Sequence, residues 1–126
     1  MKYYGADRVI EPIGALPATA WQVDNSGAVG SREIRIAVSL INLEITNFDQ
    51  ICSSCEYDEA KIKAHILQII NQRGKLHNPY TKTAGLLYGT IEEASDDFPM
   101  GDMRVGDRII CMSPLTGIPI QLDSIE

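Results

Sequence analysis

The sequence has no uninterrupted apolar run approaching the ~20 residues that a membrane-spanning helix requires, and no apolar signal region follows its N-terminal methionine and lysine. Its three cysteines are too few and too scattered for the disulfide framework of a small secreted protein. Positive charge is also scarce, because 11 lysines and arginines stand against 17 aspartates and glutamates, for a formal net charge of −6. These absences predict a cytoplasmic protein that binds neither membranes nor nucleic acid.

The few basic residues of the central region do not form a cluster. They are spread through a helix-like stretch of mixed composition, whereas a protein that grips phosphate backbones concentrates lysine and arginine on one face. We therefore expect these side chains to lie on a solvated helix face. The residues are Lys61, Lys63, Arg73 and Lys75.

Motifs for binding phosphate or metal are absent or incomplete. No GxGxxG follows an expected strand, and GxxxxGK[ST] does not occur, so the chain has no phosphate-binding loop of its own. Cys52 and Cys55 have the CxxC spacing that zinc sites and thiol exchange share, but no second pair of ligands accompanies them. We interpret them as two incidental cysteines, with an opportunistic metal site or a disulfide as the alternative.

The sequence does contain strand-like patterning, in a chain long enough for one core. It has 126 residues, of which 44% are hydrophobic, as expected of a single domain. Apolar and polar residues alternate from Glu33 to Thr46, which is the period of a half-buried strand. The phase slips by one residue between Leu40 and Ile41, and this slip predicts a bulge or a bend. Shorter strands are predicted at residues 8–11, 86–94, 108–112 and 118–122.

Only one helix is predicted. It spans about residues 58–73, begins at the N-cap Asp58 and ends at Gly74, and its isoleucines fall on one face. Trp21, which precedes a turn at residues 24–27, is expected to pack against the core. One main helix among several short strands predicts a mainly β, barrel-like domain.

A polar loop follows the predicted helix. Residues 75–85 show no periodicity and contain His77 next to Asn78 and Pro79. Binding groups tend to lie on polar loops that a rigid scaffold holds, so His77 is a candidate site residue. The alternative is a turn that Asn78 and Pro79 stabilise.

Three stretches of the chain together resemble a known family. They are Arg8-Val9-Ile10-Glu11-Pro12 with Leu16-Pro17 and Ala20-Trp21-Gln22-Val23-Asp24-Asn25, then Arg73-Gly74-Lys75-Leu76-His77-Asn78-Pro79, and then Val105-Gly106-Asp107-Arg108-Ile109. The first two resemble the L-erythro-3,5-diaminohexanoate dehydrogenases. The third resembles the turn that medium-chain dehydrogenases share in their GroES-like catalytic domain.

The resemblance implies a mainly β, GroES-like barrel over residues 1–126, the substrate side of a two-domain enzyme. The Rossmann domain that binds NAD would then be absent from this chain and be supplied in cis or in trans. The implied reaction is the oxidative deamination of 3,5-diaminohexanoate to 5-amino-3-oxohexanoate, a step of lysine fermentation. The chain alone is expected to be inactive, and the enzyme is expected to be a homo-oligomer.

The reaction that the resemblance implies sets what the site must hold, and the position and chemistry of the residues suggest candidates for it. A site for this substrate must hold two ammonium groups and one carboxylate, and a base must take a proton before hydride leaves. Glu44 and His77 are the candidate catalytic residues, and Glu44 with Asp49 would face the ammonium groups. Lys82 would face the carboxylate. The other polar residues expected to bind the substrate are Asn47, Asn78 and Thr81.

The chain departs from the zinc-dependent relatives of the wider alcohol dehydrogenase superfamily. Leu43-Glu44-Ile45-Thr46 stands where they carry a cysteine, and Thr83-Ala84-Gly85 stands where they carry Gly-His-Glu. Two of the three ligand positions are therefore lost, and we expect no catalytic zinc.

Two other functions stay open at this point. The chain could be a free-standing GroES-like binding or regulatory module without a reaction, or a small metal-binding protein built on Cys52 and Cys55. A co-chaperonin needs a mobile apolar loop, which the polar loop fits poorly, and the cysteine pair lacks further ligands. A substrate-side domain would also expose the apolar face that packs on its partner.

Overall fold

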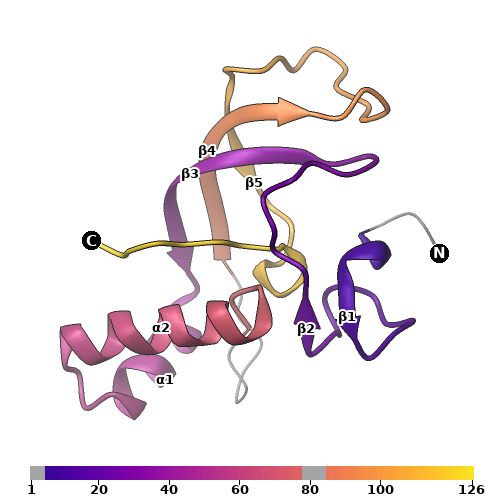
Figure 1. Ribbon diagram of the computed structural model, residues 1–126. Helices are drawn as coiled ribbons and strands as arrows, with labels where there is room; N and C mark the ends of the chain where they lie inside the picture. Colours follow the sequence, from indigo (N-terminus) through magenta and orange to yellow (C-terminus); the bar gives the residue numbers. More distant parts are fainter. Residues whose placement is uncertain (1–4, 78–84) are drawn as a thin grey trace.

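Two antiparallel sheets and two α-helices make up residues 5–77 and 85–126, the part of the chain that the computed structural model describes (Figure 1). The elements are η1 Ala6–Arg8, β1 Val9–Glu11, β2 Gln22–Val23, β3 Ile34–Leu43, α1 Ile45–Ser54, α2 Glu59–Arg73, β4 Gly85–Ala94, β5 Arg108–Cys111 and η2 Leu115–Gly117. One sheet pairs β1 with β2, and the other has the order β3-β4-β5. Both helices lie on the same side of the larger sheet, below it in Figure 1.

The three-stranded sheet confirms the strongest strand signal in the sequence. β4 lies in the middle and pairs antiparallel with β3 and with β5. Val38 pairs with Gly89 and Leu40 with Tyr88, so Ser39 is an extra residue that bulges out of the ladder. The predicted bulge is therefore present, beside the phase slip. Because of it, apolar residues on both sides of the slip pack against the same core.

The predictions that this strand continues to Thr46 and that the chain has one helix are wrong. β3 ends at Leu43, and a second helix, α1, follows at once. Glu44 is its N-cap, because the carboxylate accepts the backbone N–H groups of Thr46 and Asn47. The alternation that reached Ile45 suggested a strand, but this side chain is 79% exposed at the start of the helix.

α2 confirms the predicted main helix almost residue for residue. The Asp58 carboxylate accepts the backbone N–H of Lys61 at 3.0 Å, and Gly74 ends the helix with a left-handed φ of 73°. The isoleucine face of the helix packs into the core that α1, α2 and the larger sheet share. The buried residues of this core are Ile51, Ile66, Ile69, Ile70, Leu76, Leu87, Leu115 and Ile120.

The segment 118–122 is not the predicted strand. Ile120 donates its N–H to the Gly74 carbonyl at 2.8 Å, and its carbonyl accepts the side-chain amide of Asn25 at 2.7 Å. A strand needs a row of such bonds to one neighbour, whereas these bonds reach two separate loops. The chain then runs back along α2 toward β3 (Figure 1), and Leu122 and Ile125 pack against the core.

The mainly β character of the domain is confirmed. The strands predicted at residues 8–11, 86–94 and 108–112 are present as β1, β4 and β5. In the described residues the strands divide between two sheets, and the likeness to a GroES barrel stays a prediction. No helix within the described ranges has the length and hydropathy needed to cross a membrane.

Arg73 and Lys75 are buried, and the prediction that they lie on a solvated helix face is wrong. Arg73 Nε donates to the Trp21 carbonyl at 2.7 Å, and Nη1 donates to the His77 carbonyl at 2.6 Å. Lys75 Nζ donates to the Pro17 carbonyl at 2.6 Å. Carbonyl groups of the irregular N-terminal segment need donors when they are buried, and these two long side chains supply them. The end of α2 is thereby joined to the N-terminal segment.

Trp21 was predicted to pack against the core, and it instead packs on the buried Arg73 with about half of its surface exposed. Its side chain is 46% exposed, and the Arg73 guanidinium carbon lies 4.2 Å from the ring centroid. A guanidinium over an indole face is a favourable cation–π arrangement. The indole therefore covers the buried arginine from the solvent side.

A second arginine organises the N-terminal loop. Arg8 pairs with Glu33 through contacts of 2.9 and 2.8 Å, and the pKa of Glu33 is lowered mainly by this hydrogen bonding. The same guanidinium donates to three backbone carbonyls, those of Asp24, Ser26 and Ala28. The side chain of Arg8 thus holds together the start of β1, the loop after β2 and the residues that lead into β3.

Replacing Gly74 with alanine is expected to destabilise the chain severely. A Cβ at this position would lie 1.9 Å from the Val23 carbonyl oxygen, in a residue whose φ is 73°. The backbone of one segment must therefore move. We expect the free energy of unfolding, measured by urea denaturation, to fall by about 3 kcal/mol or more.

Gly101→Ala is the matched control. Gly101 also has a left-handed φ, of 57°, but nothing lies within 4 Å of an added Cβ. Only the conformational penalty of roughly 1–2 kcal/mol then applies. Equal losses in the two variants would show that the contact with Val23 does not constrain the end of α2.

Candidate functional site

The end of β3, which precedes Glu44, pairs with the start of β4. Leu43, the last residue of β3, pairs with Gly85, the first residue of β4. Glu44 follows Leu43 directly, and the segment that leaves His77 returns to the sheet at Gly85. A Cβ on Gly85 would lie 2.1 Å from the Asn42 carbonyl oxygen, so the close pairing depends on glycine.

The Glu44 carboxylate is held by the first turn of α1. Oε1 accepts the Thr46 N–H at 3.1 Å, and Oε2 accepts the N–H and the side-chain amide of Asn47 at 3.3 and 3.0 Å. These bonds stabilise the charged form and lower the pKa of Glu44, the contacts with Thr46 most strongly. Glu44 is therefore a stable anion and a weak proton acceptor at neutral pH.

Asn47 and Glu44 are predicted site residues that the structure brings into direct contact. Asn47 is 5% exposed, and its side-chain amide points to the carboxylate of Glu44. The side chain of Asn47 therefore positions Glu44. The signal for this pair is a carboxylate followed three residues later by an amide, a spacing that places the two at one helix start.

Asp49 lies on α1, beyond the first turn, and contacts Tyr57, which was not among the predicted site residues. Its Oδ1 accepts the hydroxyl hydrogen of Tyr57 at 3.1 Å, and this bond raises the pKa of Tyr57. Both side chains are exposed. Tyr57 was missed because it follows a helix that the sequence did not predict.

His77 is half-buried at the edge of the described residues. Its carbonyl accepts Arg73 Nη1 at 2.6 Å, so its backbone is fixed to the end of α2. Asn78, Thr81 and Lys82 lie outside the residues that the structure describes.

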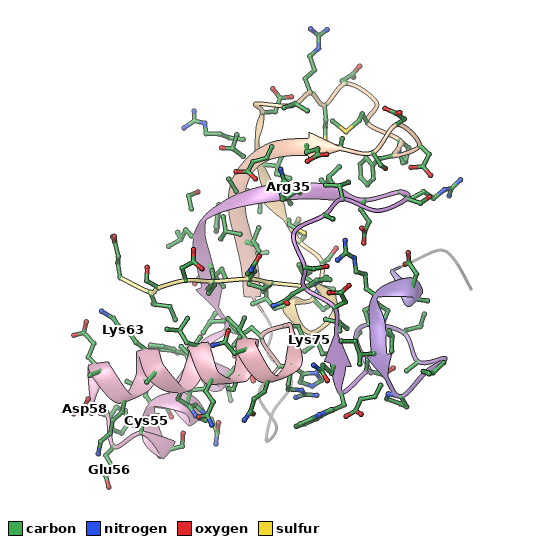
Figure 2. The ribbon with its side chains drawn as sticks, viewed as in Figure 1. Arg35, Cys55, Glu56, Asp58, Lys63 and Lys75 are labelled. Carbon is green, nitrogen blue, oxygen red and sulfur yellow. The ribbon has the colours of Figure 1, made fainter. Side chains whose placement is uncertain are left out.

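An apolar groove of about 820 Å³ lies beside these residues. Leu43 and Leu76 line it, and Glu44 and His77 follow these two residues directly in the chain. Its walls come from β3, both helices and the C-terminal segment. Lys63 on α2 points toward the C-terminal segment (Figure 2). Other lining residues are Leu40, Phe48, Tyr57, Ile62, Leu122 and Ile125.

Cys52 and Cys55 are buried, free thiols. Burial raises the pKa of the Cys52 thiol, and Cys55 Sγ donates weakly to the Lys61 carbonyl at 3.7 Å. Within residues 5–77 and 85–126, no three histidine, cysteine, aspartate or glutamate side chains gather in a metal-ligating arrangement. The two cysteines pack as small apolar side chains at the turn between α1 and α2.

Lys75 is a buried titratable group, although it was predicted to lie on a solvated helix face. Burial, and to a smaller extent the charge of Arg73, lower the pKa of Lys75 to about 8. Its side chain is 0% exposed, and its hydrogen-bond partner among the described residues is the Pro17 carbonyl. A neutral carbonyl compensates an ammonium charge only in part, which explains the direction of the shift.

Comparison with known proteins places the chain among relatives of dehydrogenases. It is 42% identical over 123 residues to the L-erythro-3,5-diaminohexanoate dehydrogenase of Acetoanaerobium sticklandii and 40% identical over 123 residues to that of Fusobacterium nucleatum subsp. nucleatum. Each alignment covers 97% of this chain and 36% of the relative, so the chain spans 36% of the length of these curated relatives. Both relatives are oxidoreductases by name.

The family follows from a match over almost the whole chain. Residues 7–126 match the L-erythro-3,5-diaminohexanoate dehydrogenase N-terminal domain. The chain belongs to this family, and the resemblance inferred from three short stretches is confirmed.

The stability of the chain is expected to rise with pH between about 8 and 10.5 because of Lys75. Below pH 8 the lysine is charged in both the folded and the unfolded state; between its folded pKa of about 8 and its unfolded value of 10.5, only the unfolded state holds the proton. The free energy of unfolding should therefore increase across this window, by up to roughly 3 kcal/mol. Urea denaturation in the presence of a reductant measures it.

Two variants isolate this contribution from other groups that titrate in the same window. Lys75→Met has no lysine to titrate at this position, so it should lack the increase in unfolding free energy that Lys75 causes. The difference in unfolding free energy between the original chain and Lys75→Met should therefore change with pH between about 8 and 10.5. Lys61→Met removes an exposed lysine and should give a constant difference. Parallel pH profiles for the original chain and Lys75→Met would contradict a lowered pKa at Lys75.

Proposed function

We propose that the chain is the substrate-side domain of an NAD-dependent dehydrogenase that deaminates 3,5-diaminohexanoate to 5-amino-3-oxohexanoate in lysine fermentation. The observation that carries this proposal is the family match over residues 7–126, a range that contains the groove, Glu44 and His77. The two relatives bear the name of this dehydrogenase, and the chain corresponds to 36% of each. The chain alone would then be inactive.

NAD would be held by a Rossmann domain outside this chain, in cis or in trans. A dinucleotide site cradles pyrophosphate in a glycine-rich turn between a parallel strand and a helix. The sheets of the described residues are antiparallel, and the chain has no GxGxxG motif, so its own residues do not fit the cofactor. The role proposed for this chain is to bind and orient the substrate.

Glu44 would receive an ammonium group of the substrate. A carboxylate accepts about four hydrogen bonds. Glu44 uses three of these positions with Thr46 and Asn47, which leaves one on Oε1 for a ligand. Because its pKa is lowered and its side chain is exposed, Glu44 suits the role of a fixed counter-ion better than that of a base.

His77 is then the proposed base. The amine that becomes an imine must lose a proton before its carbon gives up hydride, and histidine most often performs such transfers. The hydrogen bond from Arg73 to the His77 carbonyl would hold the residue in place beside the groove. Substrate contacts from Asp49, Asn78, Thr81 and Lys82 remain part of the proposal, with Lys82 facing the carboxylate.

The reaction is proposed to need no catalytic zinc. Glu44 and Gly85 lie in the two segments where zinc-dependent relatives carry ligands. Gly85 has no side chain, and the carboxylate of Glu44 has only one hydrogen-bonding position left beside those that the first turn of α1 occupies. Neither residue replaces a lost ligand.

We further propose that the enzyme is a homo-oligomer and that exposed apolar side chains of this chain contact its partners. Ile13 is 91% exposed and Met112 is 79% exposed. Large apolar side chains at such exposure support a contact with the Rossmann domain or with a second copy.

A chimera tests the proposed function. Residues 1–126 would replace the matching N-terminal part of the A. sticklandii enzyme, so that the chain is joined to the remainder of a 42% identical relative. We expect NADH and ammonia to form from 3,5-diaminohexanoate with the chimera and not with the chain alone. A chimera that folds and binds NAD but forms no NADH from 3,5-diaminohexanoate would contradict the proposal.

Variants of the active chimera separate the proposed roles. Glu44→Gln should raise KM about 10-fold with little change in kcat, because a neutral amide replaces the counter-ion. His77→Ala should lower kcat by about 100-fold or more. Asp102→Asn, at an exposed turn, is the control, and dialysis against a chelator should leave the rate unchanged. Full kcat in His77→Ala would exclude His77 as the base.

A further inference from the structure

The turn between α1 and α2 holds an aromatic ring at the edge of the groove. Glu56 and Tyr57 both have a φ of 57°, a left-handed conformation that bulky residues rarely adopt. The Tyr57 N–H donates to the Cys52 carbonyl at 2.8 Å, which fixes the turn. The side chain of Tyr57 is nevertheless 65% exposed and lines the groove. The strained backbone thus presents a ring to the groove rather than to the core.

A carboxylate that can accept further hydrogen bonds, that of Asp49, lies next to this ring. Asp49 Oδ1 accepts the Tyr57 hydroxyl hydrogen at 3.1 Å. Within the described residues Asp49 has no basic side chain at salt-bridge distance. A carboxylate beside an aromatic ring offers an ammonium group an ionic contact and a cation–π contact together.

The charges around this part of the groove favour a cation. Lys63 and Glu59 both line the groove and pair with each other at 2.8 Å, and Lys61 pairs with Glu56 at 3.2 Å, so these four charges offset one another (Figure 2). Glu126 also lines the groove and has no cationic partner in the described part of the chain. Asp49 does not line the groove itself but contacts the lining residue Tyr57, so the charge without a partner at this end of the groove is negative.

We propose that Tyr57 and Asp49 form a binding site for a primary ammonium group, and that the apolar groove takes the aliphatic chain attached to it. The inference rests on the proposed function, because 3,5-diaminohexanoate carries two ammonium groups on a six-carbon chain and Glu44 receives one of them. Tyr57 is then a specificity-determining residue that favours a diamino acid over a monoamino acid.

Binding of n-hexylammonium to the chain tests the site without the reaction. NMR titration should give saturable shifts at Tyr57 and at the groove residue Phe48. Hexan-1-ol, of the same length and uncharged, should bind at least about 3-fold more weakly. Tyr57→Ala and Asp49→Asn should each raise the Kd for n-hexylammonium about 2- to 5-fold. Tyr57→Phe keeps the ring and should have a smaller effect.

Asp102→Asn is the matched control for Asp49→Asn, because it removes the same charge from an exposed turn outside the groove. Its Kd for n-hexylammonium should equal that of the original chain. Equal affinity for n-hexylammonium and hexan-1-ol, or an unchanged Kd in both Tyr57→Ala and Asp49→Asn, would overturn the site.

The chimera separates this inference from the function on which it rests. Tyr57→Ala and Asp49→Asn should raise KM for 3,5-diaminohexanoate while kcat stays nearly constant. If n-hexylammonium binds as expected but the chimera does not oxidise the diamino acid, the ammonium site holds and the proposed function fails. If the chimera is active and KM is the same in both variants, the ammonium site fails and the proposed function holds.

Discussion

The end of α2 fixes the positions of segments that are distant in the chain, and it does so through backbone carbonyls. Gly74 lies so close to the Val23 carbonyl that no side chain fits, and its own carbonyl receives the N–H of Ile120. Arg73 and Lys75, on either side, donate to carbonyls of the N-terminal segment. Since carbonyls carry no net charge, these buried cations are only partly compensated, and the lowered pKa of Lys75 reflects this cost.

Three residues of the stretches that resemble the family hold the fold of this chain. Arg8, Asn25 and Gly74 all belong to the stretches that first suggested the family, and each bonds to a segment distant in the sequence. The proposed site lies beside this framework, where Glu44 follows β3 and His77 follows the end of α2. A match to the family is therefore first of all evidence about the architecture. The position of the proposed site follows from that architecture.

Features with local causes could be predicted from the sequence. α2 is an example, since its N-cap Asp58 and its isoleucine face lie within the helix itself. α1 could not be predicted in this way, because Glu44 is an uncommon N-cap and the apolar alternation of β3 continues past Glu44. The burial of Lys75 depends on the Pro17 carbonyl, 58 residues away in the sequence. Among the site residues, Glu44 could be predicted because it directly follows a strand that the sequence indicates. Tyr57 could not, because its position depends on the unpredicted helix α1 and on the left-handed turn after it.

The extra residue at Ser39 gives β3 one position at which its length can change without a shift in strand register, at the cost of the hydrogen bond from its hydroxyl to the Tyr88 carbonyl. Ser39 pairs with no residue of β4, so its deletion would leave every other pair of the ladder in register. Removal of Ser39 is therefore a change in the length of β3 that keeps Leu43 opposite Gly85 and Glu44 directly after the strand.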